Sequence, residues 1–276
     1  MAAPRELDRG APGSCAAVAT LPHRVALLDL DPELGADLAP DDRRARARAE
    51  LTTRIVRLPR GEWDGNALSR ADHQNVGLLL VDGVIAREVV LGDTVSTELL
   101  GAGDLIRPWG GEDEPRLLAH AIRWQVLAEV RLAVLGRAFA VAVARWPEVN
   151  AALIERACLR AQRLATMQAI SHLNSVERRL LALFWHLAER WGRMTPEGLV
   201  VPLKLSHRLL AELVGARRPT VSAALAALAR EGSLLRRDDA SWLLKGEAPG
   251  APTTTVCRVI AHRRRLLGAD APKPLG

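Results

Sequence analysis

Two adjacent arginines in the C-terminal part of the chain, Arg217 and Arg218, are the residues whose type and position most clearly predict a binding function. They precede Pro219 at the start of a helical pattern that runs to Arg230, within a segment that extends from Leu205 to Leu244. Guanidinium groups at the start of a helix can contact phosphate oxygens or the O6 and N7 atoms of guanine. The segment therefore predicts a surface that binds double-stranded DNA.

Two short helices separated by a glycine are expected to position these arginines. Ser206 is a good N-cap for the first helix, and Gly215 can take the left-handed conformation that ends it. Proline fits the first position of a helix and pushes the residue before it out of the α region, so we expect Arg218 to be the N-cap of the second helix. Because arginine offers no capping oxygen, the first amides of that helix can meet a DNA phosphate.

The second helix has two faces of different character. Its apolar residues recur at helical spacing and are expected to be buried: Val221, Ala224, Leu225 and Leu228. The other face carries only short side chains: Thr220, Ser222, Ala223, Ala226 and Ala227. Such a face can lie close to the major groove, where the methyl groups of alanine and threonine contact those of thymine. A turn at Asp238 and Asp239 between two apolar stretches then predicts a two-stranded β-wing.

Positive charge concentrates in the same part of the chain. Residues 202–276 contain 13 Lys and Arg against 6 Asp and Glu, a net charge of +7, whereas the whole chain of 276 residues carries +6. A basic region of this kind is the electrostatic footprint expected of a nucleic-acid-binding domain. A winged helix that docks another protein is the alternative, and the charge favours DNA over it.

The preceding part of the chain has the pattern of an antiparallel β-barrel, so the expected fold class is α+β. Residues 52–135 alternate between apolar and polar side chains, as short strands do. Asp82-Gly83 has the composition of a hairpin turn, and a long strand is predicted from Trp124 to Val134. A barrel of this kind can also host a metal-dependent enzyme, but its histidines are dispersed, so we expect no catalytic residues and no metal site.

Helical periodicity returns after Pro147 and predicts a long helix over residues 147–173. One seam of that helix has the spacing of a dimer interface: Ile154, Ala157, Ala161, Leu164 and Gln168. Packing inside the core of the same chain is the alternative, but the length of the helix and its single seam favour a homodimer.

Two further helices are predicted from charge and capping patterns. Asp41 to Leu51 reads as a solvated surface helix with Asp41 or Asp42 as its N-cap. Asn174 is the predicted N-cap of the helix that follows the dimerisation helix, with Glu177 at its third position. The predicted organisation is a poorly ordered N-terminus (1–22), a β-barrel sensor (23–146), a dimerisation helix (147–173), a winged helix-turn-helix domain (174–246) and a basic tail (247–276).

This order of elements, together with the sequence from Leu205 to Ser222 and the wing after it, resembles the Crp/Fnr superfamily of bacterial transcription regulators. The resemblance implies a cyclic-nucleotide-binding-like β-barrel and a homodimer that binds a palindromic operator, with RNA polymerase as a further partner. It implies that Arg218 contacts a base, and that Ser206, Arg217 and Thr220 contact phosphates. Ala223 falls at the next base-reading position, beside Ser222 on the same face.

The predicted barrel departs from the family at its ligand site. The family's phosphate cassette has a Gly-Glu pair and then an Arg followed by Ser or Thr, whereas this chain has Gly103-Asp104 and then Gly110 to Arg116 without that second pair. Three acidic residues in the second stretch would repel a phosphate, which argues against a cyclic nucleotide as cofactor. His73 or His120 could serve as a haem ligand, but lone histidines are more often structural. No cofactor is identified, and the ligand stays open.

The remaining composition is that of a cytoplasmic protein. Three scattered cysteines, Cys15, Cys158 and Cys257, have neither a disulfide pattern nor the spacing of an iron-sulfur site. We expect no membrane partner, because the most apolar stretch is interrupted by Arg137 and Arg145.

Overall fold

The computed structural model describes residues 19–68, 76–109 and 117–248. The chain divides into two compact units, Met1–Cys158 and Leu159–Gly276. Several predictions from the sequence lie wholly or largely outside the described residues: the poor order of residues 1–22, the basic tail of residues 247–276, the acidic stretch 110–116, His73, Cys15 and Cys257.

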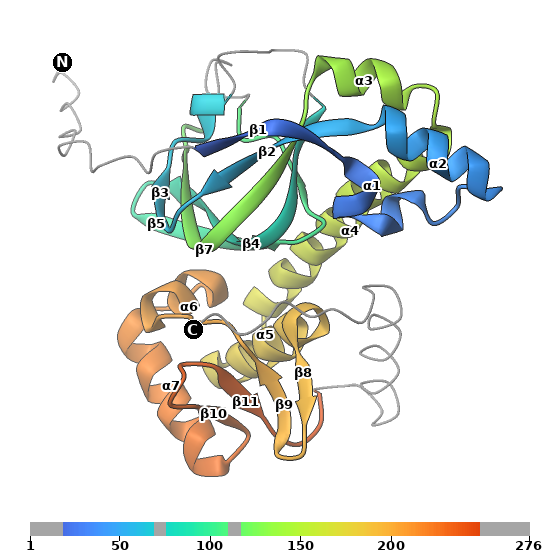
Figure 1. Ribbon diagram of the computed structural model, residues 1–276. Helices are drawn as coiled ribbons and strands as arrows, with labels where there is room; N and C mark the ends of the chain where they lie inside the picture. The colour runs from blue at the N-terminus through green and yellow to red at the C-terminus, as the bar shows by residue number, and fades with distance from the viewer. Residues whose placement is uncertain (1–18, 69–75, 110–116, 249–276) are drawn as a thin grey trace, which may run out of the picture. The chain divides into compact units, whose positions relative to one another are not determined.

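The N-terminal unit is built around one antiparallel sheet (Figure 1). Its strands are β1 (Ala19–Ala26), β2 (Thr52–Leu58), β3 (Gly61–Trp63), β4 (Gly77–Leu91), β5 (Thr94–Gly101), β6 (Leu105–Ile106) and β7 (Ala121–Leu135). Five strands form the path β1-β2-β7-β4-β5, while β3 pairs with β7 and β6 pairs with β4. No pairing of β5 with β1 closes the ring in the described part of the chain. The barrel-like antiparallel β-domain and the α+β class are confirmed.

The prediction of a hairpin turn at Asp82-Gly83 is wrong, because β4 continues through both residues. The register between β4 and β7 shifts on both sides of Asp82, which marks a β-bulge. The Asp82 carboxylate accepts hydrogen bonds from the backbone N–H and the guanidinium of Arg131 on β7, and these bonds hold the bulge. Gly83 adopts φ +87° within the bulge. The hairpin turn lies instead at Gly92 and Asp93, between β4 and β5.

Replacing Gly83 by alanine is expected to destabilise the N-terminal unit strongly. A Cβ atom at Gly83 would lie 2.2 Å from the carbonyl oxygen of Glu129, in a residue that must also keep a positive φ. We expect urea denaturation to show a loss of about 3 kcal/mol or more in the free energy of unfolding. The matched control is Gly92→Ala, because Gly92 also has a positive φ but meets no atom within 4 Å. Its expected cost is about 1 kcal/mol, and equal losses for the two variants would refute the bulge.

Two apolar cores lie on opposite sides of the C-terminal end of β7, because successive side chains of a strand point to opposite faces. Val130 and Leu132 face the core that the curled sheet encloses, and Ala133 and Leu135 face the other core. Helices complete this second core: α1 (Leu27–Leu30), α2 (Asp41–Glu50), α3 (Arg137–Val143) and the start of α4 (Pro147–Ser171). The alternation predicted for β7 is therefore present, but both faces are buried where it ends.

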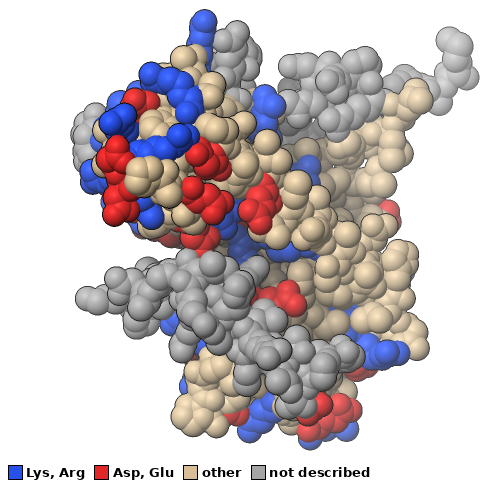
Figure 2. Space-filling view, turned by 90° about the vertical axis from the view of Figure 1, so that its right-hand side faces the viewer, with Lys and Arg blue, Asp and Glu red and all other residues tan. Residues whose placement is uncertain are grey.

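The charged helix predicted near the N-terminus is α2, but its predicted N-cap is wrong. Pro40 occupies the N-cap position without a side-chain hydrogen bond, and Asp41 and Asp42 lie in the first turn. Ala47 is the buried residue of this helix, and the other side chains reach solvent wholly or partly. Figure 2 shows basic and acidic side chains intermingled on the face of the N-terminal unit that carries α2. The helix is thus the solvated surface helix expected from its composition.

The long helix predicted after Pro147 is α4. Its first half is held to the N-terminal unit by ion pairs: Arg156 Nη2 lies 3.2 Å from Asp31 Oδ1 and 2.5 Å from Glu33 Oε2. Burial raises the pKa of Asp31, although the neighbouring Arg156 charge opposes this rise. Glu148 accepts a further hydrogen bond from Arg43 on α2. Like the other helices in the described part of the chain, α4 is not long and apolar enough to cross a membrane.

The C-terminal unit combines helices with a small antiparallel sheet. Its elements are α5 (Val176–Trp191), β8 (Arg193–Thr195), β9 (Gly198–Val201), α6 (His207–Val214), α7 (Arg218–Glu231), β10 (Leu234–Arg236) and β11 (Trp242–Leu244). The predicted wing strands β10 and β11 are present, but they belong to a sheet in the order β10-β11-β9-β8, so the sequence reading missed two strands. The prediction that Asn174 caps α5 is wrong by one residue, because the side chain of Ser175 accepts the hydrogen bond from the Arg178 N–H.

Candidate nucleic-acid interface

The first helix of the predicted DNA-binding segment has the start and the end that the sequence indicates. The Ser206 hydroxyl accepts a hydrogen bond from the Leu209 N–H at 3.2 Å, so Ser206 is the N-cap of α6. Gly215 ends the helix in the left-handed conformation, with φ +61°. Because the cap uses only an acceptor site of the Ser206 hydroxyl, its hydrogen can still be donated to an external oxygen.

The second helix, α7, begins one residue earlier than predicted. Arg217 is the N-cap and Arg218 the first helical residue, so the assignment of Arg218 as the cap is corrected. The preference of a residue before proline for extended backbone is weaker here than the hydrogen bonding of the first turn, in which the Val221 N–H donates to Arg217 O at 3.1 Å. Arg217 makes no side-chain cap hydrogen bond. The α7 N-terminus therefore combines a positive dipole end with two exposed arginines.

The two faces of α7 are those expected from the sequence. Its apolar face is buried: Val221, Ala224, Leu225 and Leu228 are each at most 7% exposed. Of the short side chains predicted for the other face, Thr220, Ala223 and Ala226 are exposed, while Ser222 and Ala227 are half-buried. A face of such short side chains allows the helix axis to approach a nucleic-acid groove closely. Of the residues predicted to bind DNA, all except Ser222 are exposed: Ser206, Arg217, Arg218, Thr220 and Ala223.

Ser222 is held by contacts inside the protein. Its Oγ atom lies 2.8 Å from Nδ1 of His207 on α6 and 3.1 Å from the carbonyl oxygen of Arg218. The structure thus brings Ser222 and Arg218 together and adds His207, which the sequence reading did not select for this surface.

Arg179 on α5 is a second residue that the sequence reading missed. Its Nε atom donates to Leu173 O at 2.7 Å, and its Nη1 atom donates to Val214 O and Gly215 O at 3.3 and 3.4 Å. The guanidinium therefore covers carbonyl groups at the end of α6, where the helix dipole is negative, and ties them to the segment between α4 and α5. The two contacts to the end of α6 span 35 and 36 residues, so no local sequence signal reveals them.

Replacing Arg179 by methionine is expected to loosen the junction between α6 and α7. Three carbonyl groups lose a charged donor, while the aliphatic part of the side chain is kept. We expect the free energy of unfolding to fall by about 1–3 kcal/mol in urea denaturation. Arg178→Met is the matched control. Arg178 is exposed, and in the described part of the chain its guanidinium donates one hydrogen bond, from Nη1 to the side chain of Asn174. A loss as large for Arg178→Met as for Arg179→Met would contradict the assigned role.

The wing is anchored in the core of the C-terminal unit. The rings of Trp242 on β11 and Phe184 on α5 have centroids 4.8 Å apart, and the Arg236 guanidinium lies 5.9 Å from the Trp242 ring. In the wing turn, Asp239 Oδ1 accepts hydrogen bonds from the hydroxyl and the backbone N–H of Ser241. The hydroxyl bond is the main reason why the pKa of Asp239 is lowered. The wing therefore presents an exposed arginine beside a turn that stays anionic.

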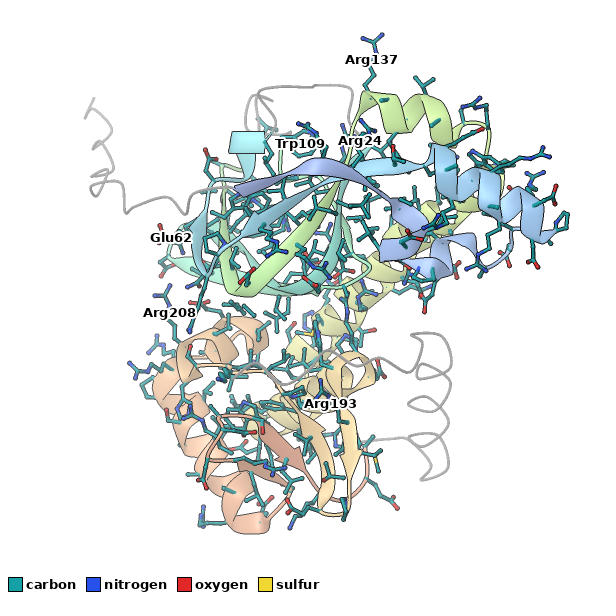
Figure 3. All side chains as sticks on the ribbon, in the orientation of Figure 1. Arg24, Glu62, Trp109, Arg137, Arg193 and Arg208 are labelled. Atoms are coloured by element: carbon teal, nitrogen blue, oxygen red, sulfur yellow. The ribbon has the colours of Figure 1, made fainter. Side chains whose placement is uncertain are left out.

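Arginines at other points of the C-terminal unit are partly neutralised by carboxylates. Arg208 on α6 pairs with Glu212 one turn later at 2.9 Å, and Figure 3 shows its side chain extending away from the helix. Arg237 lies 3.7 Å from Glu197. Arg217 and Arg218 differ from these arginines in two ways. They lie at a helix N-terminus, and neither forms an ion pair with a carboxylate among the described residues.

The β-domain encloses a core rich in tryptophan. Trp63 and Trp124 pack edge to face with centroids 5.6 Å apart, and Trp109, labelled in Figure 3, belongs to the same core. Asp104, at the position of the family's cassette glutamate, is buried and accepts a hydrogen bond from the Gly101 N–H at 2.9 Å. Its carboxylate thus holds the turn between β5 and β6.

The histidine considered as a haem ligand in the described residues is His120. Its Nδ1 atom lies 3.3 Å from the Leu118 carbonyl oxygen. Within residues 19–68, 76–109 and 117–248, no group of three His, Cys, Asp or Glu side chains has the arrangement of a metal site.

Comparisons with known proteins agree with this geometry. Residues 178–245 match the family of Crp-like helix-turn-helix domains. No curated protein matches the chain in sequence.

Solved structures with a similar fold include a CooA variant from Carboxydothermus hydrogenoformans, with a TM-score of 0.54 and 18% identity over 75% of this chain and 87% of that one. FixK2 from Bradyrhizobium japonicum has a TM-score of 0.51 and 15% identity over 80% and 98% of the two chains. The c-di-GMP responsive global regulator CLP of Xanthomonas campestris has a TM-score of 0.51 and 18% identity over 71% and 95%. The C-terminal unit therefore carries a Crp-like helix-turn-helix domain, and the chain has the fold of these three structures.

Proposed function

We propose that two copies of this chain associate through α4 and insert their α7 helices into successive major grooves of a palindromic operator. Arg218 reads a base, Arg217, Thr220 and Ser206 contact phosphates, and the methyl group of Ala223 approaches the base edges. The observation that carries this proposal is the N-terminus of α7, which combines two exposed arginines with an uncapped first turn and a face of short side chains.

The exposure of the α4 seam supports the homodimer. Ile154 is 58% and Leu164 42% exposed, although both are large apolar residues. The other seam residues, Ala157, Ala161 and Gln168, are exposed as well, whereas Ile170 on the other side of the helix is buried. Packing of this seam inside the core of the same chain, the alternative from the sequence, does not explain that exposure. A second copy of α4 would cover it with small side chains that permit close approach.

We further propose that the β-domain responds to a ligand other than a cyclic nucleotide. The protein then acts in the cytoplasm, where it regulates transcription by RNA polymerase. The support is local: Asp104 serves the turn between β5 and β6, and the stretch after Trp109 carries acidic residues where the family's cassette has an arginine and a hydroxyl residue. The role of the protein is then regulation rather than catalysis.

Selection of bound duplexes from a random library, followed by mobility-shift titration over a salt series, tests this function. Neutralisation of several phosphates predicts that affinity falls steeply with salt, by about 10³-fold or more between 50 and 200 mM if six or more phosphates are contacted. The selected sequences should be palindromic, with half-sites about 10 base pairs apart. Absent or salt-insensitive DNA binding would favour the protein-docking alternative, and enrichment of single half-sites would contradict the dimer.

A further inference from the structure

We propose that His207 and Ser222 form an interhelical clamp that positions Arg218 for base reading, an inference that rests on the DNA binding proposed above. His207 is the first residue of α6, and Ser222 lies one turn into α7. The 2.8 Å contact between His207 Nδ1 and Ser222 Oγ joins the two helices beside the α7 N-terminus. The clamp makes His207 a positioning residue, since it acts on DNA through Ser222 and Arg218.

The hydrogen bonds of the clamp run in one direction. The Ser222 hydroxyl has a single hydrogen, and the Arg218 carbonyl oxygen, 3.1 Å away, can only accept. Ser222 therefore donates to Arg218 O, and His207 Nδ1 carries a hydrogen that it donates to Ser222 Oγ. Both the neutral ring with its hydrogen on Nδ1 and the imidazolium can make this contact. The chain of bonds ends on the backbone of the arginine that is predicted to read a base.

The clamp changes the role of Ser222 on the reading face. Its only hydrogen is used inside the protein, so the hydroxyl is not a free donor for a phosphate or a base. Its contribution is instead to fix the Arg218 carbonyl, and with it the backbone from which the guanidinium extends. A base contact through two hydrogen bonds needs that backbone in place, whereas a phosphate contact tolerates small displacements. Loss of the clamp is therefore expected to reduce specificity more than general DNA affinity.

Two amide substitutions distinguish the ring nitrogens of His207. The side-chain nitrogen of asparagine lies where Nδ1 does, and that of glutamine where Nε2 does, so His207→Asn can keep the bond to Ser222 and His207→Gln cannot. With the full chain and a duplex selected from a random library, we expect His207→Asn to stay within about twofold of the parent affinity. His207→Gln and Ser222→Ala are expected to weaken specific binding about three- to tenfold and to leave binding to random DNA unchanged.

The double variant His207→Gln with Ser222→Ala should lose no more than Ser222→Ala alone, because both changes break one chain of bonds. His172→Gln is the matched control, since His172 is exposed outside the two helices. Equal losses for asparagine and glutamine at position 207, additive losses in the double variant, or equal losses on random DNA would each overturn the clamp. Failure of the parent chain to enrich any duplex would instead overturn the proposed function.

Discussion

An Arg218→Ala variant is expected to lose specific DNA binding while it keeps its oligomeric state and most of its affinity for random DNA. Arg218 is exposed at the first position of α7, and only its main chain takes part in the hydrogen bonds described for the fold. Loss of a bidentate contact to guanine costs about 1–3 kcal/mol for each half-site. Mobility-shift titration on the selected duplex and on random DNA, with sedimentation analysis of the free protein, measures all three quantities.

Arg230→Ala is the matched control for this prediction. Arg230 is also an exposed arginine of α7, but it lies in the last turn, away from the uncapped N-terminus. We expect its removal to leave the ratio of specific to random affinity unchanged. If Arg218→Ala weakened binding to both duplexes equally, and reduced the salt dependence by about one counterion, Arg218 would be a phosphate contact rather than a base reader.

The helix-turn-helix could be predicted from the sequence because its boundaries depend on local chemistry. The Ser206 hydroxyl caps a backbone N–H three residues later, and Gly215 acts through its own left-handed backbone. The apolar face of α7 follows from helical spacing alone. The one-residue error concerns Arg218, on which two opposing influences act. Pro219 disfavours the helical conformation at the residue before it, whereas the hydrogen bonds of the first turn of α7 favour that conformation.

Two predictions failed because the decisive contact is distant in the sequence. Asp82-Gly83 and Gly92-Asp93 both offer a glycine with positive φ, and the choice between bulge and turn depends on Arg131, which lies 49 residues beyond Asp82. Ser222 looks like an outward-facing residue until His207, 15 residues away, is placed beside it. Apolar periodicity in a sequence predicts which face of a helix is buried. It does not predict which residue forms a hydrogen bond with a polar side chain at the edge of that face.

A double variant with Ile154→Glu and Leu164→Glu is expected to be monomeric and to lose palindromic DNA binding. Both side chains are exposed on the α4 seam, so the changes should not unfold the chain, yet a dimer would bury four carboxylates against small apolar residues. We expect the dimer dissociation constant to rise by about 100-fold or more. Because two linked half-site contacts reinforce each other, affinity for the palindrome should fall by a similar factor, while affinity for a single half-site changes little.

The matched control adds the same two charges elsewhere on α4, through Gln162→Glu and Thr166→Glu. Both residues are exposed, and helical geometry places them about 120° or more from the centre of the seam. This variant should remain dimeric in sedimentation analysis and should bind the palindrome with less than about threefold loss, since only long-range repulsion from DNA is added. If both variants became monomeric, added charge rather than the seam would be responsible. If the seam variant stayed dimeric, the association would have to use another surface, and exposed Ile154 and Leu164 would need a different partner.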